Sequence, residues 1–351
     1  MLFRSRLDLE LTEQTVNDDL QMELAHTCND GLASLFVGVG LEGRILFGQL
    51  CQRDAHLLVA SLGLRLDGDA DNGLRELHGL QNDGMILIID NLGGRAQIVA
   101  KIEDQQAIRH IDDIILAADV IMVARGDLGI EVSIEELPII QRRIIRHCHR
   151  LGRRCIVATH MLESMITQPT PTRAEVTDVS NAIFEQADAV MLSGETSVGH
   201  YPVRCVEVLD SIAHRMERSG NLNFAASAIL NGDRQKATKA AISLADSVEN
   251  ACMVIFTRRG LAATQAAVLR PERAPIFAFS NDPVVVRQLA LARDVTAFES
   301  PFLKDPARMI STALNLLKEK GLITSGQPVV IQGDSLQGEL LADSIIFMRA
   351  E

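Results

Sequence analysis

The chain contains few aromatic side chains and has no excess of positive charge. Aromatic residues account for 3% of its 351 residues, with eleven Phe, one Tyr and no Trp. Lys and Arg together number 34 against 46 Asp and Glu, which gives a formal net charge of −12. An acidic surface repels a phosphate backbone, and few aromatic side chains are available to stack on bases. We therefore expect no nucleic-acid partner.

The sequence also has no long apolar run and no paired-cysteine motif. A membrane-spanning helix needs roughly 18 or more consecutive apolar residues, and no run approaches that length. The first residues, MLFRSRLDLELTEQ, become acidic before an apolar stretch of signal-peptide length is reached. The six cysteines form no CxxC pair, which is typical of a reducing compartment. These absences predict a cytoplasmic protein that does not bind membranes.

The clearest pattern in the chain is an alternation of short apolar runs and helix-period segments between residues 97 and 222. Strands that alternate with amphipathic helices form βα units with a parallel sheet. Local signals mark the helix ends: Ser133 with Glu136, and Thr172 with Glu175, match the capping box, and Gly152 is placed as a C-cap. The predicted strands are 97–101, 120–124, 155–159 and 187–193.

The alternation restarts after residue 222, so we expect two domains, 1–222 and 223–351. The second is predicted to be a smaller α/β domain. The first 96 residues differ from the rest of their domain. A helix over residues 11–25 and a strand over 32–37 are predicted there, whereas 38–96 give mixed signals and no assignment.

Polar residues follow three of the predicted strands where each one ends. Strand period puts the side chains of Lys101 and Glu103 on one face, where a cation and a carboxylate could bind phosphate and a divalent metal. Gly126 and Asp127 come after the next strand, and Thr159 ends the third. Each segment alone also has a structural interpretation, as a strand-end ion pair, a tight turn or an ordinary strand residue. The carboxyl ends of parallel strands, however, are where such folds place their chemistry.

Five segments follow one another in this region: KIE (101–103), MVARGDLG (122–129), ATHMLESM (158–165), PTRAE (171–175) and MLSGET (191–196). Taken in this order, they resemble the characteristic blocks of the pyruvate kinase family. The resemblance implies a partial or rebuilt TIM-type (β/α) barrel over residues 1–222, divergent in 1–96, followed by a three-layer α/β C-terminal domain over 223–351.

The resemblance also implies a reaction and a role for each candidate residue. The reaction is the glycolytic transfer of a phosphoryl group from phosphoenolpyruvate to ADP, which yields pyruvate and ATP. Lys101 would neutralise the transferring group, and Glu103 and Asp127 would hold Mg²⁺. The backbone at Gly126 and Asp127 would bind the substrate carboxylate, and Thr159 would face the enol carbon. The family also implies K⁺, but no ligands for it are found in this sequence.

Departures from the family leave a second interpretation open. We recognise neither the family's first three barrel strands nor its lid domain, and His160 stands where the family usually has Gln. The chain could therefore be a catalytically impaired relative that keeps only a Mg²⁺ and phosphoenolpyruvate half-site, or an assembly subunit. An open barrel would expose strand edges, so a homo-oligomer is expected.

A lesser alternative comes from a glycine motif outside these blocks. Gly38-Val39-Gly40-Leu41-Glu42-Gly43 has the GxGxxG spacing, and Asp67 follows at a distance suited to binding a ribose. This motif binds dinucleotides only where a strand precedes it and a helix follows it. The alternative is therefore a dinucleotide-binding unit at the start of the chain.

Overall fold

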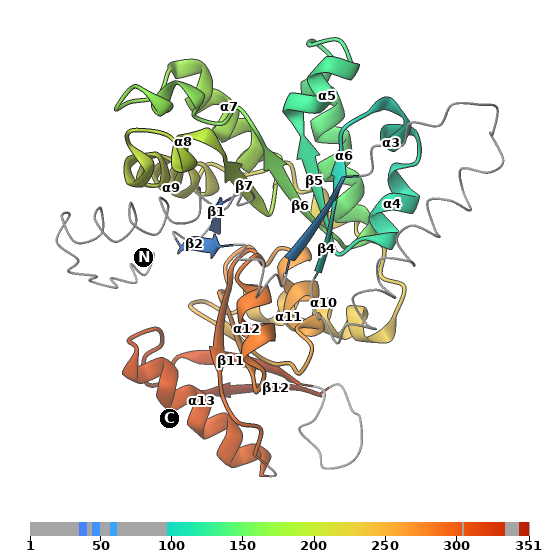
Figure 1. Cartoon of the computed structure of the whole chain (residues 1–351). Helices are drawn as coiled ribbons and strands as arrows, with labels where there is room; N and C mark the ends of the chain where they lie inside the picture. The colour runs from blue at the N-terminus through green and yellow to red at the C-terminus, as the bar shows by residue number, and fades with distance from the viewer. Residues whose placement is uncertain are drawn as a thin grey trace.

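The computed structural model describes residues 97–303, 305–333 and 344–350, and the backbone of three earlier strands. These strands are β1 (Leu35–Gly40), β2 (Arg44–Gln49) and β3 (Leu57–Ser61). The described residues form a seven-stranded and a five-stranded sheet, each with its own helices (Figure 1). The predicted helix over 11–25 lies outside the described residues, as do Asp67 and most of 38–96.

Four parallel strands form the centre of the seven-stranded sheet. They are β4 (Gln97–Ile102), β5 (Val120–Ala124), β6 (Arg154–Ala158) and β7 (Ala189–Leu192). Strand β3 extends this array in parallel beside β4, whereas β1 pairs antiparallel with both β7 and β2. The order is β2-β1-β7-β6-β5-β4-β3. Strands buried on both faces are expected to be continuously apolar, which explains runs such as VIMVA in β5.

Helices cover one face of this sheet. Ile102, Ile121 and Val157 point into the core that these helices share with the sheet, and Val99, Met122 and Ile156 form a smaller cluster on the other face. The helical segments are α3 (Gln105–Arg109), α4 (Ile111–Ala117), α5 (Arg125–Glu131), α6 (Leu137–Leu151), η1 (Glu163–Ile166), α7 (Arg173–Phe184), α8 (Gly194–Ser197) and α9 (Pro202–Glu217).

Two of the three predicted helix-end signals are confirmed. Glu175 N donates to Thr172 Oγ1 at 3.3 Å and Thr172 N donates to Glu175 Oε2 at 2.7 Å, so this capping box is complete. Gly152 has a φ of 74°, the left-handed conformation of a helix C-cap. The box predicted from Ser133 is wrong. Its side chain makes no cap hydrogen bond, because the backbone turns there through Glu136 N to Ser133 O and α6 begins at the following Leu-Pro step.

The glycine motif at Gly38–Gly43 is not a dinucleotide-binding turn. Gly38 and Gly40 lie within β1, and the chain reverses so that Gly40 pairs with Arg44 at the start of β2. A second strand therefore follows the motif where dinucleotide binding requires the N-terminus of a helix. The prediction of a dinucleotide-binding unit at this place is wrong.

The five-stranded sheet has helices on both faces, which makes three layers (Figure 1). Its strands are β8 (Cys252–Phe256), β9 (Ile276–Ser280), β10 (Val295–Glu299), β11 (Pro328–Gly333) and β12 (Ser344–Arg349). Their order is β10-β9-β8-β11-β12, and all pairs are parallel except β11 with β12. Its helices are α10 (Asp233–Ser247), α11 (Leu261–Val268) and α12 (Pro283–Leu289) on one face and α13 (Pro306–Glu319) on the other. The short helix η2 (Phe224–Ser227) precedes α10 and packs through Phe224 against the core of the seven-stranded sheet. The domain division at residues 222 and 223 stays a prediction.

A buried ion pair connects the two sheets. Arg270, just after α11, places Nη1 2.9 Å from Asp188 Oδ1, and its Nη2 donates to Gln186 O at 2.8 Å. Asp188 also accepts from Cys155 N at 2.8 Å. Both side chains are almost fully buried. Burial opposes ionisation of Asp188, but Arg270 and His149 outweigh it and hold the pKa of this carboxyl below its usual range.

Beside this pair, His149 makes stability depend on pH. Burial and the nearby Arg270 lower the pKa of His149 to about 4, so the neutral ring donates from Nε2 to Gln186 O at 2.8 Å. In the unfolded chain this ring binds a proton near pH 6.5, at about the ordinary histidine pKa. Between these two values only the unfolded chain binds the proton. Lowering the pH through this window is therefore expected to cost up to about 3 kcal/mol of unfolding free energy.

Urea unfolding at a series of pH values checks this expectation. His149→Gln keeps a donor in place of Nε2 but does not titrate, so its stability should fall less than that of the wild type as the pH decreases from about 6.5 to 4. The stability contributed by Asp188 is lost at lower pH, because its folded pKa is depressed. An equal pH dependence in wild type and variant would show that His149 is not the source.

Candidate active site

Two carboxylates and one ammonium group meet where β4 and β5 end. Lys101 lies at the end of β4 on the same face as Val99, and its Nζ forms an ion pair with Glu103. The same Nζ lies 3.7 Å from Asp127 Oδ2 on α5, which begins directly after β5. Side-chain exposure is 16% for Glu103 and 60% for Asp127. One carboxylate is therefore fixed in the protein, and the other faces solvent.

A hydrogen bond joins the next strand to this cluster. Gly126 N donates to Thr159 Oγ1 at 2.8 Å, so the segment after β5 and the end of β6 are held together. A Cβ at Gly126 would lie 3.4 Å from His160 Cε1 and 3.5 Å from Thr159 Oγ1, in ordinary contact. An anion that took the Gly126 N–H would have to share it with the Thr159 hydroxyl or displace that hydroxyl. The five predicted site residues thus lie in one continuous set of contacts.

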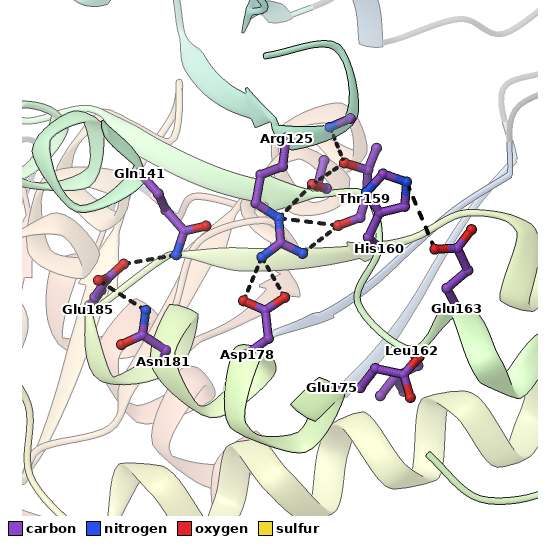
Figure 2. Close-up of polar contacts among 12 residues, drawn as sticks. Arg125, Gln141, Thr159, His160, Leu162, Glu163, Glu175, Asp178, Asn181 and Glu185 are labelled. Atoms are coloured by element: carbon purple, nitrogen blue, oxygen red, sulfur yellow. Dashed lines mark hydrogen bonds and ion pairs between the residues drawn. The ribbon is translucent and has the colours of Figure 1, made fainter. Parts of the chain in front are cut away.

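The chain after β6 has an unusual backbone. Thr159 and His160 have φ values of 69° and 54°, in the left-handed region that residues other than glycine seldom adopt. Such residues cost roughly 1–3 kcal/mol each and persist where the surroundings hold them. His160 points outward, with Nε2 3.9 Å from Glu163 Oε2 (Figure 2). The strain lies at the residue predicted to face the substrate.

Arg125 holds this strained turn, and sequence reasoning assigned it no role. Its Nε lies 3.2 Å from both Ala158 O and Thr159 O, and its Nη2 also donates to Thr159 O. On its other side Nη1 contacts both oxygens of Asp178 on α7, at 2.8 and 2.6 Å (Figure 2). The RGDLG motif placed Arg125 at the strand end, but nothing in the sequence signalled Asp178.

Two further carboxylates fix the loop after β6. Glu195 on α8 accepts from Leu162 N at 3.0 Å and from Ser193 N at 2.7 Å. Glu175 accepts from both the amide and the hydroxyl of Ser164. Burial alone would raise the pKa of Glu175, but hydrogen bonds from Ser164 and Thr172 outweigh it and lower that pKa. The PTRAE and MLSGET blocks therefore support the loop that carries Thr159.

The donor set suits Mg²⁺. Among the described residues no three His, Cys, Asp or Glu side chains group as metal ligands. Mg²⁺ is usually held by one or two carboxylates, with substrate oxygens and waters completing its shell. Glu103 and Asp127 both approach the ammonium of Lys101, so they face one point of positive charge. Two carboxylates that meet at one ammonium, one of them largely exposed, fit this ion.

Both parts of the chain match models of known protein families. The model of the pyruvate kinase barrel domain matches residues 14–206, and the model of the pyruvate kinase alpha/beta domain matches residues 235–342. The chain belongs to the pyruvate kinase family. The predicted fold class, a partial barrel followed by an α/β C-terminal domain, is confirmed. Within the described residues, no helix has the length and hydropathy needed to cross a bilayer.

Individual pyruvate kinases are similar in sequence to about two thirds of this chain. The chain is 42% identical over 236 residues to pyruvate kinase isozyme G, chloroplastic, of Ricinus communis, covering 67% of this chain and 56% of the relative. It is 40% identical over 251 residues to a pyruvate kinase of Geobacillus stearothermophilus, covering 69% and 42%. The crystal structure of a pyruvate kinase from Cryptosporidium parvum superposes with a TM-score of 0.72 at 31% identity, covering 78% of this chain and 57% of that one. The chain spans about half the length of the curated relatives it matches.

Proposed function

We propose that this chain transfers a phosphoryl group from phosphoenolpyruvate to ADP, forming pyruvate and ATP. The observation that carries the proposal is the convergence of Lys101, Glu103 and Asp127 at adjacent strand ends, next to the Gly126–Thr159 contact. Phosphoryl transfer depends chiefly on positioning and on stabilising negative charge. The ammonium of Lys101, the Mg²⁺ that the two carboxylates would hold and the N–H of Gly126 would together supply both.

Each residue has a distinct task in this reaction. Lys101 stabilises the charge that develops on the transferring group. Glu103 and Asp127 hold Mg²⁺, which when bound supplies Lewis-acid stabilisation of phosphate and enolate oxygens. The backbone at Gly126 and Asp127 orients the substrate carboxylate. Thr159 faces the enol carbon that becomes the methyl group of pyruvate, and Lys101 and Thr159 are the proposed catalytic residues.

A second candidate is a relative that binds substrate without turnover. It is favoured by the antiparallel β1 and β2 at one edge of a sheet whose other described strands are parallel. In this form Glu103, Asp127 and Gly126 bind Mg²⁺ and phosphoenolpyruvate, or the chain serves as an assembly subunit. We assign no ligands to K⁺. We also propose that the chain is cytoplasmic and assembles as a homo-oligomer.

The test is ADP-dependent pyruvate formation by the full chain with Mg²⁺ and K⁺. We expect turnover that stops when Mg²⁺ is chelated and that is lost in Asp127→Ala. Calorimetric titration with phosphoenolpyruvate, with and without Mg²⁺, separates the two candidates. A folded chain that binds phosphoenolpyruvate only with Mg²⁺ but forms no pyruvate is the impaired relative. A chain that does neither contradicts both.

A further inference from the structure

We propose that Arg125 and Asp178 form a positioning pair that holds the strained Thr159–His160 turn and so orients the Thr159 hydroxyl. This inference rests on the function proposed above, because it concerns the residue that faces the enol carbon. Neither residue was singled out for a role by sequence reasoning. Arg125 acts through Thr159 and is a positioning residue rather than a catalytic one.

The guanidinium of Arg125 makes hydrogen bonds on both of its sides. On one side it contacts the carbonyls of Ala158 and Thr159, and on the other it forms a two-point contact with Asp178. Its side chain is 7% exposed. A planar group with several fixed N–H donors suits this geometry, whereas a lysine ammonium would act as a single point charge. The pair therefore ties α7 to the end of β6.

The contacts of Arg125 explain why the turn persists. The left-handed φ values of Thr159 and His160 turn the peptide between them, and the Thr159 carbonyl of that peptide accepts from Arg125. In this partly buried turn, a carbonyl without a partner would add to the strain that the backbone already carries. Arg125 removes that penalty, and Asp178 balances its buried charge.

A shared carbonyl links this pair to the reactive hydroxyl. Thr159 Oγ1 donates to Ala158 O at 2.7 Å and accepts from Gly126 N at 2.8 Å. Arg125 Nε also donates to Ala158 O, at 3.2 Å. If the hydroxyl turns its proton toward substrate, Ala158 O keeps Arg125 as a donor. The hydroxyl can therefore reorient without leaving a buried acceptor unsatisfied.

The matched variants are Arg125→Lys, Asp178→Asn and a control, Arg142→Lys. Arg142 is also paired with a carboxylate, its Nε 2.8 Å from buried Glu185, but its side chain is 54% exposed, and on α6 it contacts none of the site residues in the described structure. Four quantities are measured on the full chain: kcat and KM for pyruvate formation, the melting temperature, and the rate of hydrogen–deuterium exchange of peptides covering residues 124–130. The last reports the Gly126 amide, whose protection depends on Thr159 Oγ1.

Arg125→Lys should lower kcat about 100-fold, because a displacement of about 1 Å at a reacting group has an effect of that size. KM for ADP should stay unchanged, and exchange at residues 124–130 should accelerate. Asp178→Asn should also lower kcat and accelerate exchange, but by less. Arg142→Lys should change neither kcat nor exchange. Equal effects in Arg125→Lys and Arg142→Lys would overturn the proposal, as would wild-type kcat and exchange in Arg125→Lys. If Arg125→Lys does not fold, Asp178→Asn decides by the same readouts.

The exchange measurement also separates this inference from the proposed function. If the wild type forms no pyruvate, the proposed function fails, but the Gly126 amide can still be followed. Faster exchange in Arg125→Lys than in Arg142→Lys would then support the positioning pair by itself. Unchanged exchange would contradict it whether or not the chain is active.

Discussion

Lys101→Met is expected to lower kcat for pyruvate formation by about 1,000-fold and to leave the chain folded, since removing one charge-stabilising donor commonly costs 10²–10³. Lys101 faces the cluster of Glu103 and Asp127, and its side chain is only 25% exposed. Met has a similar length and no charge. Partly exposed ion pairs contribute little to stability, so we expect a small change in the free energy of unfolding.

The variant should also separate binding from turnover. The ammonium of Lys101 contacts both carboxylates, and its removal leaves two negative charges close together. Affinity for Mg²⁺ should therefore be kept or increased while kcat falls. Lys236→Met, at an exposed pair with Asp233, is the control and should retain full activity. Turnover close to wild type in Lys101→Met would contradict the assignment of Lys101 to the transferring group.

The largest effect on stability is expected at the ion pair between the two sheets. Arg270→Met leaves Asp188 charged and buried without its main partner, which should cost about 3–5 kcal/mol of unfolding free energy. The loss is large because both side chains are almost fully buried and Gln186 O also loses a donor. By contrast, Arg204→Met breaks an exposed pair with Glu207 and should cost at most about 1 kcal/mol.

A double-mutant cycle measured by urea unfolding isolates this pair. Arg270→Met and Asp188→Asn should each destabilise the chain, and the double variant should lose less than the two single losses added together. The shortfall measures the coupling between the two residues. Additive losses would show that Arg270 and Asp188 contribute independently, and the account of the contact between the sheets would be wrong.

Sequence reasoning predicted the features of this fold that depend on local pattern. The alternation of apolar runs with helix-period segments predicted the parallel strands. The two-residue period of a strand placed Lys101 and Glu103 on one face, where they form an ion pair. The Thr172 and Glu175 box is confirmed because both its hydrogen bonds are local. The Ser133 box has the same spacing, yet the backbone turns before the helix begins. Gly38–Gly43 shows the same limit, because β2 follows the motif instead of a helix.

Contacts between distant segments could not be predicted in this way. Arg125 and Asp178 lie far apart in the chain and come into contact because α7 packs near the end of β6. Arg270 and Asp188 likewise belong to different domains of the fold. Neither periodicity nor a sequence motif predicts such contacts. The left-handed turn at Thr159 was equally hidden, because threonine seldom adopts that conformation. The sequence therefore indicated the residues of the site but not the residues that hold them.

The most direct test of the account is pyruvate formation from phosphoenolpyruvate and ADP by the wild-type chain, beside Lys101→Met from the same purification. The account predicts Mg²⁺-dependent turnover in the wild type and its loss in a variant that remains folded. No turnover in a folded wild type, or equal turnover in both proteins, would contradict it.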